Sequence, residues 1–180
     1  MILTELWHGV WFILPAWAGN MLACTFGGGR PIDGGKTFAD GRPILGKGKT
    51  IRGVCVGIFF AIGVALAQRY VLSFFDVYDY WFNPYIFGFL MGGGAMMGDL
   101  VKSFVKRRLN FPSGSPFPPF DQLDFIAGAL VLYYGLGPFV LNRFYRLGWK
   151  PLLAIIVISP LIHLLFNIIG YKLNMKDVWW

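Results

Sequence analysis

The sequence predicts an all-α integral membrane protein with about five transmembrane helices and two basic loops that form its functional site. Hydrophobic residues make up 56% of the 180 residues and charged residues only 14%, a balance outside the range of soluble globular domains. The apolar segments are close to the length of about 20 residues that a helix needs to cross a bilayer core. Most charges lie between these segments, and a charge beside lipid is costly unless it faces water, a partner or a ligand.

Five apolar segments divide the chain, and no repeat, soluble domain or low-complexity linker separates them. We therefore expect a single polytopic membrane domain over residues 1–180. The first segment has no basic region ahead of it and no convincing cleavage site, which indicates a retained span rather than a signal peptide. The predicted spans lie near residues 6–26, 53–75, 84–101, 122–142 and 150–171.

Two long basic loops, at residues 27–52 and 102–121, connect the first span to the second and the third to the fourth. Five spans place both loops and the C-terminal tail on one side of the membrane, together with most of the cations. The positive-inside rule makes this side cytoplasmic, so we expect the N-terminus outside, the C-terminus inside and the site at the cytoplasmic face. Lys172 and Lys176 in the tail and the acidic link 76–84 support this orientation, whereas Arg143, Arg146 and Lys150 oppose it.

The third span ends in polar residues that share one helical face. Asp99, Lys102, Ser103 and Lys106 are spaced i, i+3, i+4 and i+7 if the helix continues past the apolar segment. A carboxylate, a hydroxyl and two ammonium groups then converge. The alternative is an interfacial helix whose basic side chains reach lipid headgroups, which would explain Arg107 and Arg108 equally well. That alternative does not explain why an acid, Asp99, lies at the edge of the hydrocarbon core of the membrane.

Asp121 and Asp124 follow the proline-rich stretch "SGSPFPPF". Because proline is tolerated only up to the first turn of a helix, the fourth helix should begin at about Asp121. One interpretation is helix capping, with Asp121 as the cap and Asp124 reinforcing the first turn. The other is that both carboxylates lie beside Asp99. Three close acids repel one another unless a cation lies between them, and oxygen ligands completed by phosphate favour Mg²⁺.

The first loop contains "GGKT" and "GKGKT", which resemble phosphate-binding loops but lack the first glycine of that pattern and the strand before it. Glycines still allow backbone N–H groups to approach an anion. The basic residues of the loop would neutralise that anion, and Thr50 would lie at a helix N-terminus. The alternative is that the loop is a flexible basic segment on an anionic membrane surface. The basic residues concerned are Lys36, Lys47, Lys49 and Arg52.

Few polar residues lie inside the spans. Asn20, His163 and Asn167 are expected to form interhelical hydrogen bonds, although Asn20 is near enough to the basic loops to contact a ligand. Two histidines and two cysteines without metal-binding spacing make a zinc or iron site improbable.

Four elements resemble, in order and spacing, the archaeal CDP-archaeol synthase family over nearly the whole chain. A looser similarity connects the chain with phosphatidate cytidylyltransferases. The larger family's His-Gly-Gly before the acids is replaced here by Pro118-Pro119-Phe120, and its Arg between them by Gln122. The four elements are "LPAWAGN" (14–20), "FGGGRPIDGGKTFADGRPILGKGKTIRG" (26–53), "GDLVKSFVKRR" (98–108) and "DQLDF" (121–125).

This resemblance implies transfer of CMP from CTP to 2,3-bis-O-geranylgeranylglycerol 1-phosphate, giving a CDP-archaeol-type lipid and pyrophosphate with Mg²⁺ as cofactor. Asp121 and Asp124 would be metal ligands, and Asp99 a third ligand or an orienter of the ammonium groups. We expect no nucleic-acid partner. The expected catalytic residues are Asp99, Lys106, Asp121 and Asp124, and the expected substrate-binding residues are Lys36, Lys49, Thr50, Arg52, Lys102, Ser103 and Arg107.

Two alternatives use the same sequence features. A CTP-dependent polyprenol kinase would need similar residues but would transfer the γ-phosphate to a hydroxyl group. A small transporter or membrane scaffold would place polar groups near the membrane midplane and break or repeat its spans, whereas this chain concentrates its charges at one face. The identity of the product separates the two enzymatic interpretations.

Overall fold

The computed structural model describes residues 2–74, 83–112 and 114–172, and in this part of the chain it is all-helical. Each predicted apolar segment lies largely within one helix, so the predicted fold class is confirmed. Part of the acidic link, at residues 76–82, and Lys176 lie outside the described residues. The helices are α1 (Ile2–Phe26), α2 (Ile51–Ser73), α3 (Pro84–Arg108), α4 (Phe120–Val140) and α5 (Trp149–Lys172).

Four of the helices, α1, α2, α4 and α5, are long and apolar enough to cross a membrane. Helix α3 is not among them, because its middle is rich in glycine and its last turns are basic. Most of its residues from Phe87 to Met96 are nevertheless buried against neighbouring helices, although Phe89, Met97 and Val101 are exposed. A helix that is mostly buried needs less apolar surface toward lipid, so a fifth crossing by α3 remains a prediction.

Helix α3 packs closely against α4 because glycines face each other where the two helices meet. A Cβ atom added at Gly98 would overlap the carbonyl oxygen of Asp124, and one at Gly94 would overlap that of Gly128. The two backbones are therefore in contact, which small residues permit between membrane helices. This contact places Asp99, the residue after Gly98, beside the first turns of α4.

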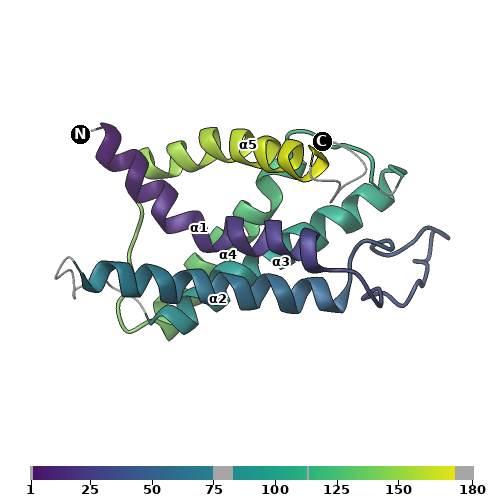
Figure 1. Cartoon of the computed structure of the whole chain (residues 1–180). Helices are drawn as coiled ribbons and strands as arrows, with labels where there is room; N and C mark the ends of the chain where they lie inside the picture. The colour runs from purple at the N-terminus through teal and green to yellow at the C-terminus, as the bar shows by residue number, and fades with distance from the viewer. Residues whose placement is uncertain (1, 75–82, 113, 173–180) are drawn as a thin grey trace.

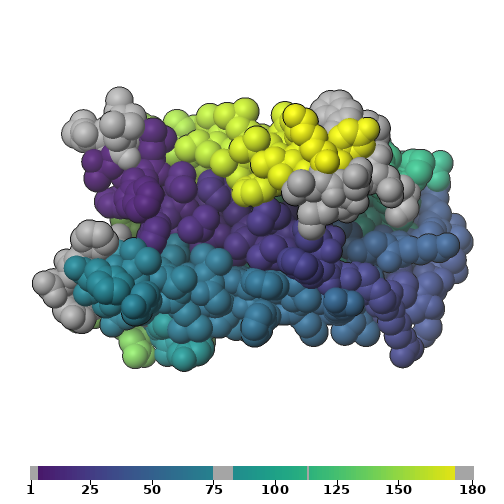
Figure 2. Space-filling model, in the orientation of Figure 1, coloured from purple at the N-terminus to yellow at the C-terminus, as the bar shows by residue number. Residues whose placement is uncertain are grey.

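The apolar core lies between α1, α3 and α4 and is dominated by aromatic rings. The ring centroids of Phe12 and Tyr133 are 4.9 Å apart, and those of Phe12 and Phe87 are 5.4 Å apart, both in edge-to-face arrangements. Such contacts add to the free energy gained from burying the rings. Figure 2 shows α1, α2 and α5 forming one face of the molecule, with the first loop at one end.

The first loop, residues 27–50, is folded rather than extended, and it projects from the ends of α1 and α2 (Figure 1). Its two ends pair through hydrogen bonds from Ile32 N to Lys49 O (2.8 Å) and from Ile51 N to Arg30 O (3.2 Å). A second bridge joins Thr37 to Pro43 further out. The pairing at its base fixes the direction from which Lys49 enters the helical bundle.

Candidate active site

Three carboxylates from two helices surround one ammonium group at the junction of α3 and α4. The Nζ atom of Lys102 lies 3.2 Å from Asp99 Oδ1, 3.0 Å from Asp121 Oδ1 and 2.9 Å from Asp124 Oδ2. Lys102 and Asp99 are one helical turn apart on α3, as their spacing predicts. The cluster is mostly removed from solvent, since only 13% of the Lys102 side chain and 6% of the Asp124 side chain are exposed.

Two further lysines flank this cluster. Lys49 of the first loop contacts both oxygens of Asp99, at 2.8 Å and 2.6 Å. Lys106, one turn beyond Lys102 on α3, lies 3.3 Å from Asp121 Oδ1 and also donates to the carbonyl of Ser115. Three lysines and three aspartates therefore alternate in one lysine–aspartate cluster, which consists of Lys49, Lys102, Lys106, Asp99, Asp121 and Asp124. An entering polyanion could replace the carboxylates as the partner of these lysines.

Capping does not explain the two acids of α4. The helix begins at Phe120, one residue earlier than predicted, and its N-cap is Pro119, which supplies no side-chain hydrogen bond. Asp121 instead accepts a hydrogen bond from the backbone N–H of Phe117, outside the helix. Asp124 is directed at Lys102. The capping interpretation is therefore wrong for Asp121 as the cap residue, and ion pairing accounts for both side chains.

Carboxylate oxygens are suitable ligands for Mg²⁺, but the ammonium group of Lys102 occupies the point on which the three carboxylates converge. Oδ1 of Asp124 is buried and accepts no hydrogen bond from any described residue, and such an orphaned carboxylate oxygen calls for a donor or a cation. Among the described residues, no three acidic, histidine or cysteine side chains are yet arranged to hold a metal. A metal ion at this point would require the Lys102 ammonium group to withdraw.

Two of the predicted binding residues instead hold the loop and helices together. The hydroxyl of Ser103 is buried and donates to the carbonyl of Leu45 in the first loop, at 2.8 Å. Thr50 is the N-cap of α2, as its place before the second span suggested, and its hydroxyl accepts from Gly53 N at 3.0 Å. Lys36 and Arg52 are exposed, and the structure does not bring them into the cluster.

Arg107 and Arg108 do not reach outward as interfacial side chains would. Arg107 is buried, donates to the carbonyl of Pro112 at 3.2 Å and lines a cavity of about 670 Å³ between the first loop and the end of α3. Arg108 pairs with Asp40 at 2.6 Å and lies over the rings of Phe38 and Phe104. The headgroup interpretation is therefore wrong for both arginines, and Arg108 joins the first loop to α3.

Asp33 was not expected to matter, yet it organises the first loop. Its carboxylate accepts hydrogen bonds from the backbone N–H groups of Gly35 (2.9 Å), Leu45 (2.9 Å) and Gly46 (3.1 Å). Burial alone would raise the pKa of Asp33, but these three donors stabilise the charged form and lower the pKa overall. An Asp-Gly-Gly sequence is a turn signal, and it is the one feature that could have revealed this role in advance.

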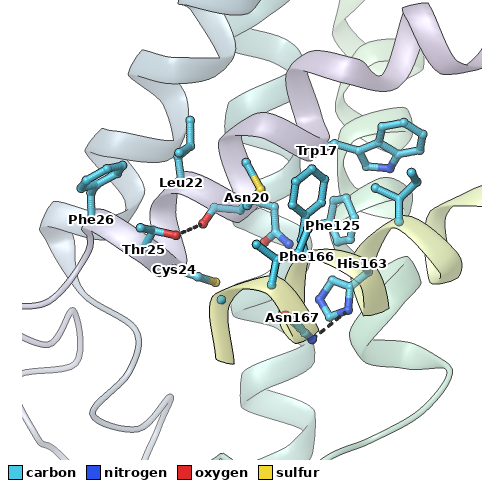
Figure 3. A pocket seen from close by; sticks show the side chains of 14 residues that line it. Trp17, Asn20, Leu22, Cys24, Thr25, Phe26, Phe125, His163, Phe166 and Asn167 are labelled. Carbon is cyan, nitrogen blue, oxygen red and sulfur yellow. Dashed lines mark hydrogen bonds between the residues drawn. The ribbon is translucent and has the colours of Figure 1, made fainter. Parts of the chain in front are cut away.

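A small cavity of about 40 Å³ lies on the α1 side of the cluster. It is lined by Lys49, Thr50 and Asp99, and by Asn20 and Cys24 of α1. The same two α1 residues also line a larger apolar cavity between α1 and α5 (Figure 3). The expectation that Asn20 lies close to the site is consistent with this position.

Comparison with known proteins gives one consistent result over the whole chain. A family model described as CarS-like CDP-archaeol synthase matches residues 2–180. The CDP-archaeol synthase of Methanopyrus kandleri is 45% identical over 98% of this chain and 94% of its own length. That of Methanocaldococcus jannaschii is 42% identical over the full length of both chains. A solved structure, described as an intramembrane enzyme for archaeal membrane lipid biosynthesis, is 31% identical, has a TM-score of 0.74 and aligns with 88% of this chain and 92% of its own.

Proposed function

This chain belongs to the CDP-archaeol synthase family, and from that premise we propose that the lysine–aspartate cluster between α3 and α4 is where its cytidylyl transfer takes place. The chain is a CTP-dependent cytidylyltransferase of archaeal lipid synthesis. The observation that supports this location is the convergence of Lys49, Lys102 and Lys106 on three aspartates at one end of a membrane-embedded bundle.

The acceptor is an ether lipid phosphate, 2,3-bis-O-geranylgeranylglycerol 1-phosphate. One of its phosphate oxygens attacks the α-phosphorus of CTP, the bond from that phosphorus to the bridging oxygen breaks, and pyrophosphate leaves with the electron pair. The nucleophile is already an anion, so the site needs no strong general base. What it must supply is alignment of two polyanions and stabilisation of the charge that develops on pyrophosphate.

The residues of the cluster have different roles in aligning the substrates and stabilising the developing charge. Lys49 and Lys106 each contact an aspartate at the edge of the cluster, and they exchange these contacts for phosphate oxygens when substrates enter. Asp99 keeps the ammonium groups of Lys49 and Lys102 in place. The neighbouring cavity lined by Arg42, Lys47 and Arg107 accommodates the anionic end of the nucleotide.

Asp121 and Asp124 are the residues that would hold Mg²⁺, with Asp99 as a third ligand or an orienting group. When bound, the ion neutralises triphosphate charge that lysines alone would balance poorly. The orphaned oxygen of Asp124 is the observation that supports this assignment. With the ion bound, Lys102 would leave the centre of the carboxylates and could contact the phosphates.

Product analysis tests the proposed reaction. Purified protein in liposomes, given CTP, Mg²⁺ and the prenyl-ether glycerol phosphate, should form a CDP-lipid and release pyrophosphate. EDTA should stop the reaction, and the free prenyl-ether glycerol should not react because it lacks the anionic nucleophile. Formation of CDP and a phosphorylated lipid would instead establish a lipid kinase, and turnover unchanged by EDTA would refute the metal assignment.

A further inference from the structure

Helices α1 and α5 are in contact at one end and separate toward the other (Figure 1). Near their beginnings, a Cβ atom added at Gly9 would lie 2.7 Å from the carbonyl oxygen of Pro151, so the two backbones touch. Further along, the indole Nε1 of Trp17 donates to the Ser159 hydroxyl at 3.0 Å in a buried hydrogen bond. Pro160 follows at once and breaks the regular hydrogen bonding of α5. Beyond this point the helices leave a groove between them.

The groove has a volume of about 230 Å³ and is predominantly apolar. Phe125, the residue after Asp124, forms part of its wall, and the Asn167 amide contacts the His163 ring nitrogen at 3.3 Å along one side (Figure 3). Two other lining residues, Phe26 and Phe166, are 46% and 39% exposed, so the groove is open at the surface of the bundle. An apolar groove that opens sideways from membrane helices is accessible to hydrocarbon from the bilayer.

The groove and the small cavity beside the candidate active site share two lining residues of α1. Asn20 and Cys24 line both the groove and the small cavity in which Lys49 and Asp99 meet. The side-chain amide of Asn20 makes no hydrogen bond with any of the residues that the structure describes, although a polar group at this depth normally finds a partner. A polar donor therefore lies between the apolar groove and the charged cluster.

We propose that this groove binds one hydrocarbon chain of the lipid phosphate acceptor, with Asn20 at the passage between chain and headgroup. The inference rests on the proposed function, since it places the acceptor phosphate at the lysines of the cluster. A lipid held there has its glycerol and ether oxygens at the level of Asn20, whose NH₂ group donates to them. The chain then leaves along the groove toward the bilayer, shielded by Phe125 and Phe166.

A matched pair of substitutions tests the groove by kinetics. Ile162 and Ile158 are one turn apart on α5 and both are partly buried against the core, but Ile162 lines this groove whereas Ile158 lines a separate apolar cavity near Trp149. Ile162→Trp should raise the KM for the long-chain acceptor about tenfold, or about 1.4 kcal/mol of binding. The KM for CTP should stay within about twofold. Ile158→Trp should change neither value, and equal effects of the two variants would overturn the proposal.

A photocrosslinking experiment provides a readout that does not depend on turnover. A dialkylglycerol phosphate with a diazirine partway along one chain, added to the protein in liposomes without CTP, should label the residues of α1 and α5 that line the groove. Excess unlabelled lipid phosphate should compete, and Ile162→Trp should reduce the label severalfold. Labelling that a neutral dialkylglycerol competes equally well, or labelling of other helices only, would overturn the groove while the proposed reaction stands. Failure of the wild-type protein to make a CDP-lipid would instead overturn the proposed function.

Discussion

At the scale of single residues, Lys102 is the most informative side chain of the candidate site. Its ammonium group lies within 3.2 Å of Asp99, Asp121 and Asp124, in the position where three converging carboxylates would otherwise place a cation. In this arrangement the lysine prevents mutual repulsion of the acids. If these carboxylates bind Mg²⁺ as proposed, the lysine would also keep the ion out until anionic substrates draw the ammonium group away.

This interpretation predicts the effect of Lys102→Met, which preserves the length of the side chain and removes its charge. Three nearly buried carboxylates would lose their central partner, and breaking such a buried ion pair costs about 3 kcal/mol. The unfolding temperature in detergent should therefore fall, and Mg²⁺ should raise it more in the variant than in the wild type. A variant that is destabilised but does not respond to Mg²⁺ would show that these carboxylates do not bind the ion.

Sequence spacing was sufficient to place Asp99, Lys102 and Lys106 on one helical face, because helical periodicity decides that arrangement. It could not show that Lys102 occupies the centre of the acids, since this depends on how closely α3 approaches α4. The roles of Asp33 and Arg108 were missed for a similar reason. Both depend on the path of the first loop, which long-range contacts such as Ser103 to Leu45 determine.

At the scale of elements, the contact between α3 and α4 positions the site. A methyl group at Gly98 would overlap the carbonyl oxygen of Asp124, so the helices meet at that level only because the residue is glycine. The five predicted apolar segments correspond well to the helices, because length and hydrophobicity are local properties. Helix α3 continues to Arg108, as the one-face spacing of its polar residues required, so the predicted basic loop at residues 102–121 is helical at both ends. The burial of the middle of α3 against the other helices did not follow from its sequence.

Substitution of Gly98 by alanine should therefore damage the site without removing any polar group. The helices must separate by a fraction of an ångström or more, which moves Asp124 away from Lys102 and Asp99. We expect kcat for CDP-lipid formation to fall at least about tenfold, since small displacements of reacting groups are costly. Gly135→Ala on α4 is the matched control, because nothing lies within 4 Å of a Cβ atom there. Comparable activity losses in both variants would argue against the importance of the contact.

At the scale of the whole molecule, the bundle brings the lysine–aspartate cluster and the first loop to one end and leaves apolar surfaces along its length. The first loop and the end of α3 are joined there through Arg108 and Asp40, so a loop and a helix end that are distant in sequence form one polar surface. The positive-inside rule predicts that this end faces the cytoplasm, and the basic residues between α4 and α5 oppose that prediction.

Cysteine labelling decides the orientation. In a variant with Cys24 and Cys55 replaced by alanine, Thr37→Cys in the first loop should be protected from an impermeant thiol reagent added outside intact cells. Asn142→Cys, in the exposed link between α4 and α5, should react. Permeabilisation should make Thr37→Cys reactive and serves as the control. The reverse labelling pattern would place the active site outside the cell.

The central claim is that the cluster between α3 and α4 carries out cytidylyl transfer, and Asp124→Asn tests it most directly. The substitution removes one charge at nearly constant volume, from a carboxylate that contacts Lys102 and has an orphaned oxygen. The measurement is CDP-lipid formation in liposomes beside the unfolding temperature, with Asp40→Asn as a control outside the cluster. The account predicts that Asp124→Asn lowers kcat at least about 100-fold, equivalent to about 2.7 kcal/mol. The unfolding temperature should stay near that of the wild type, and Asp40→Asn should retain most activity. An Asp124→Asn variant that is folded and still forms the CDP-lipid at close to the wild-type rate would contradict it.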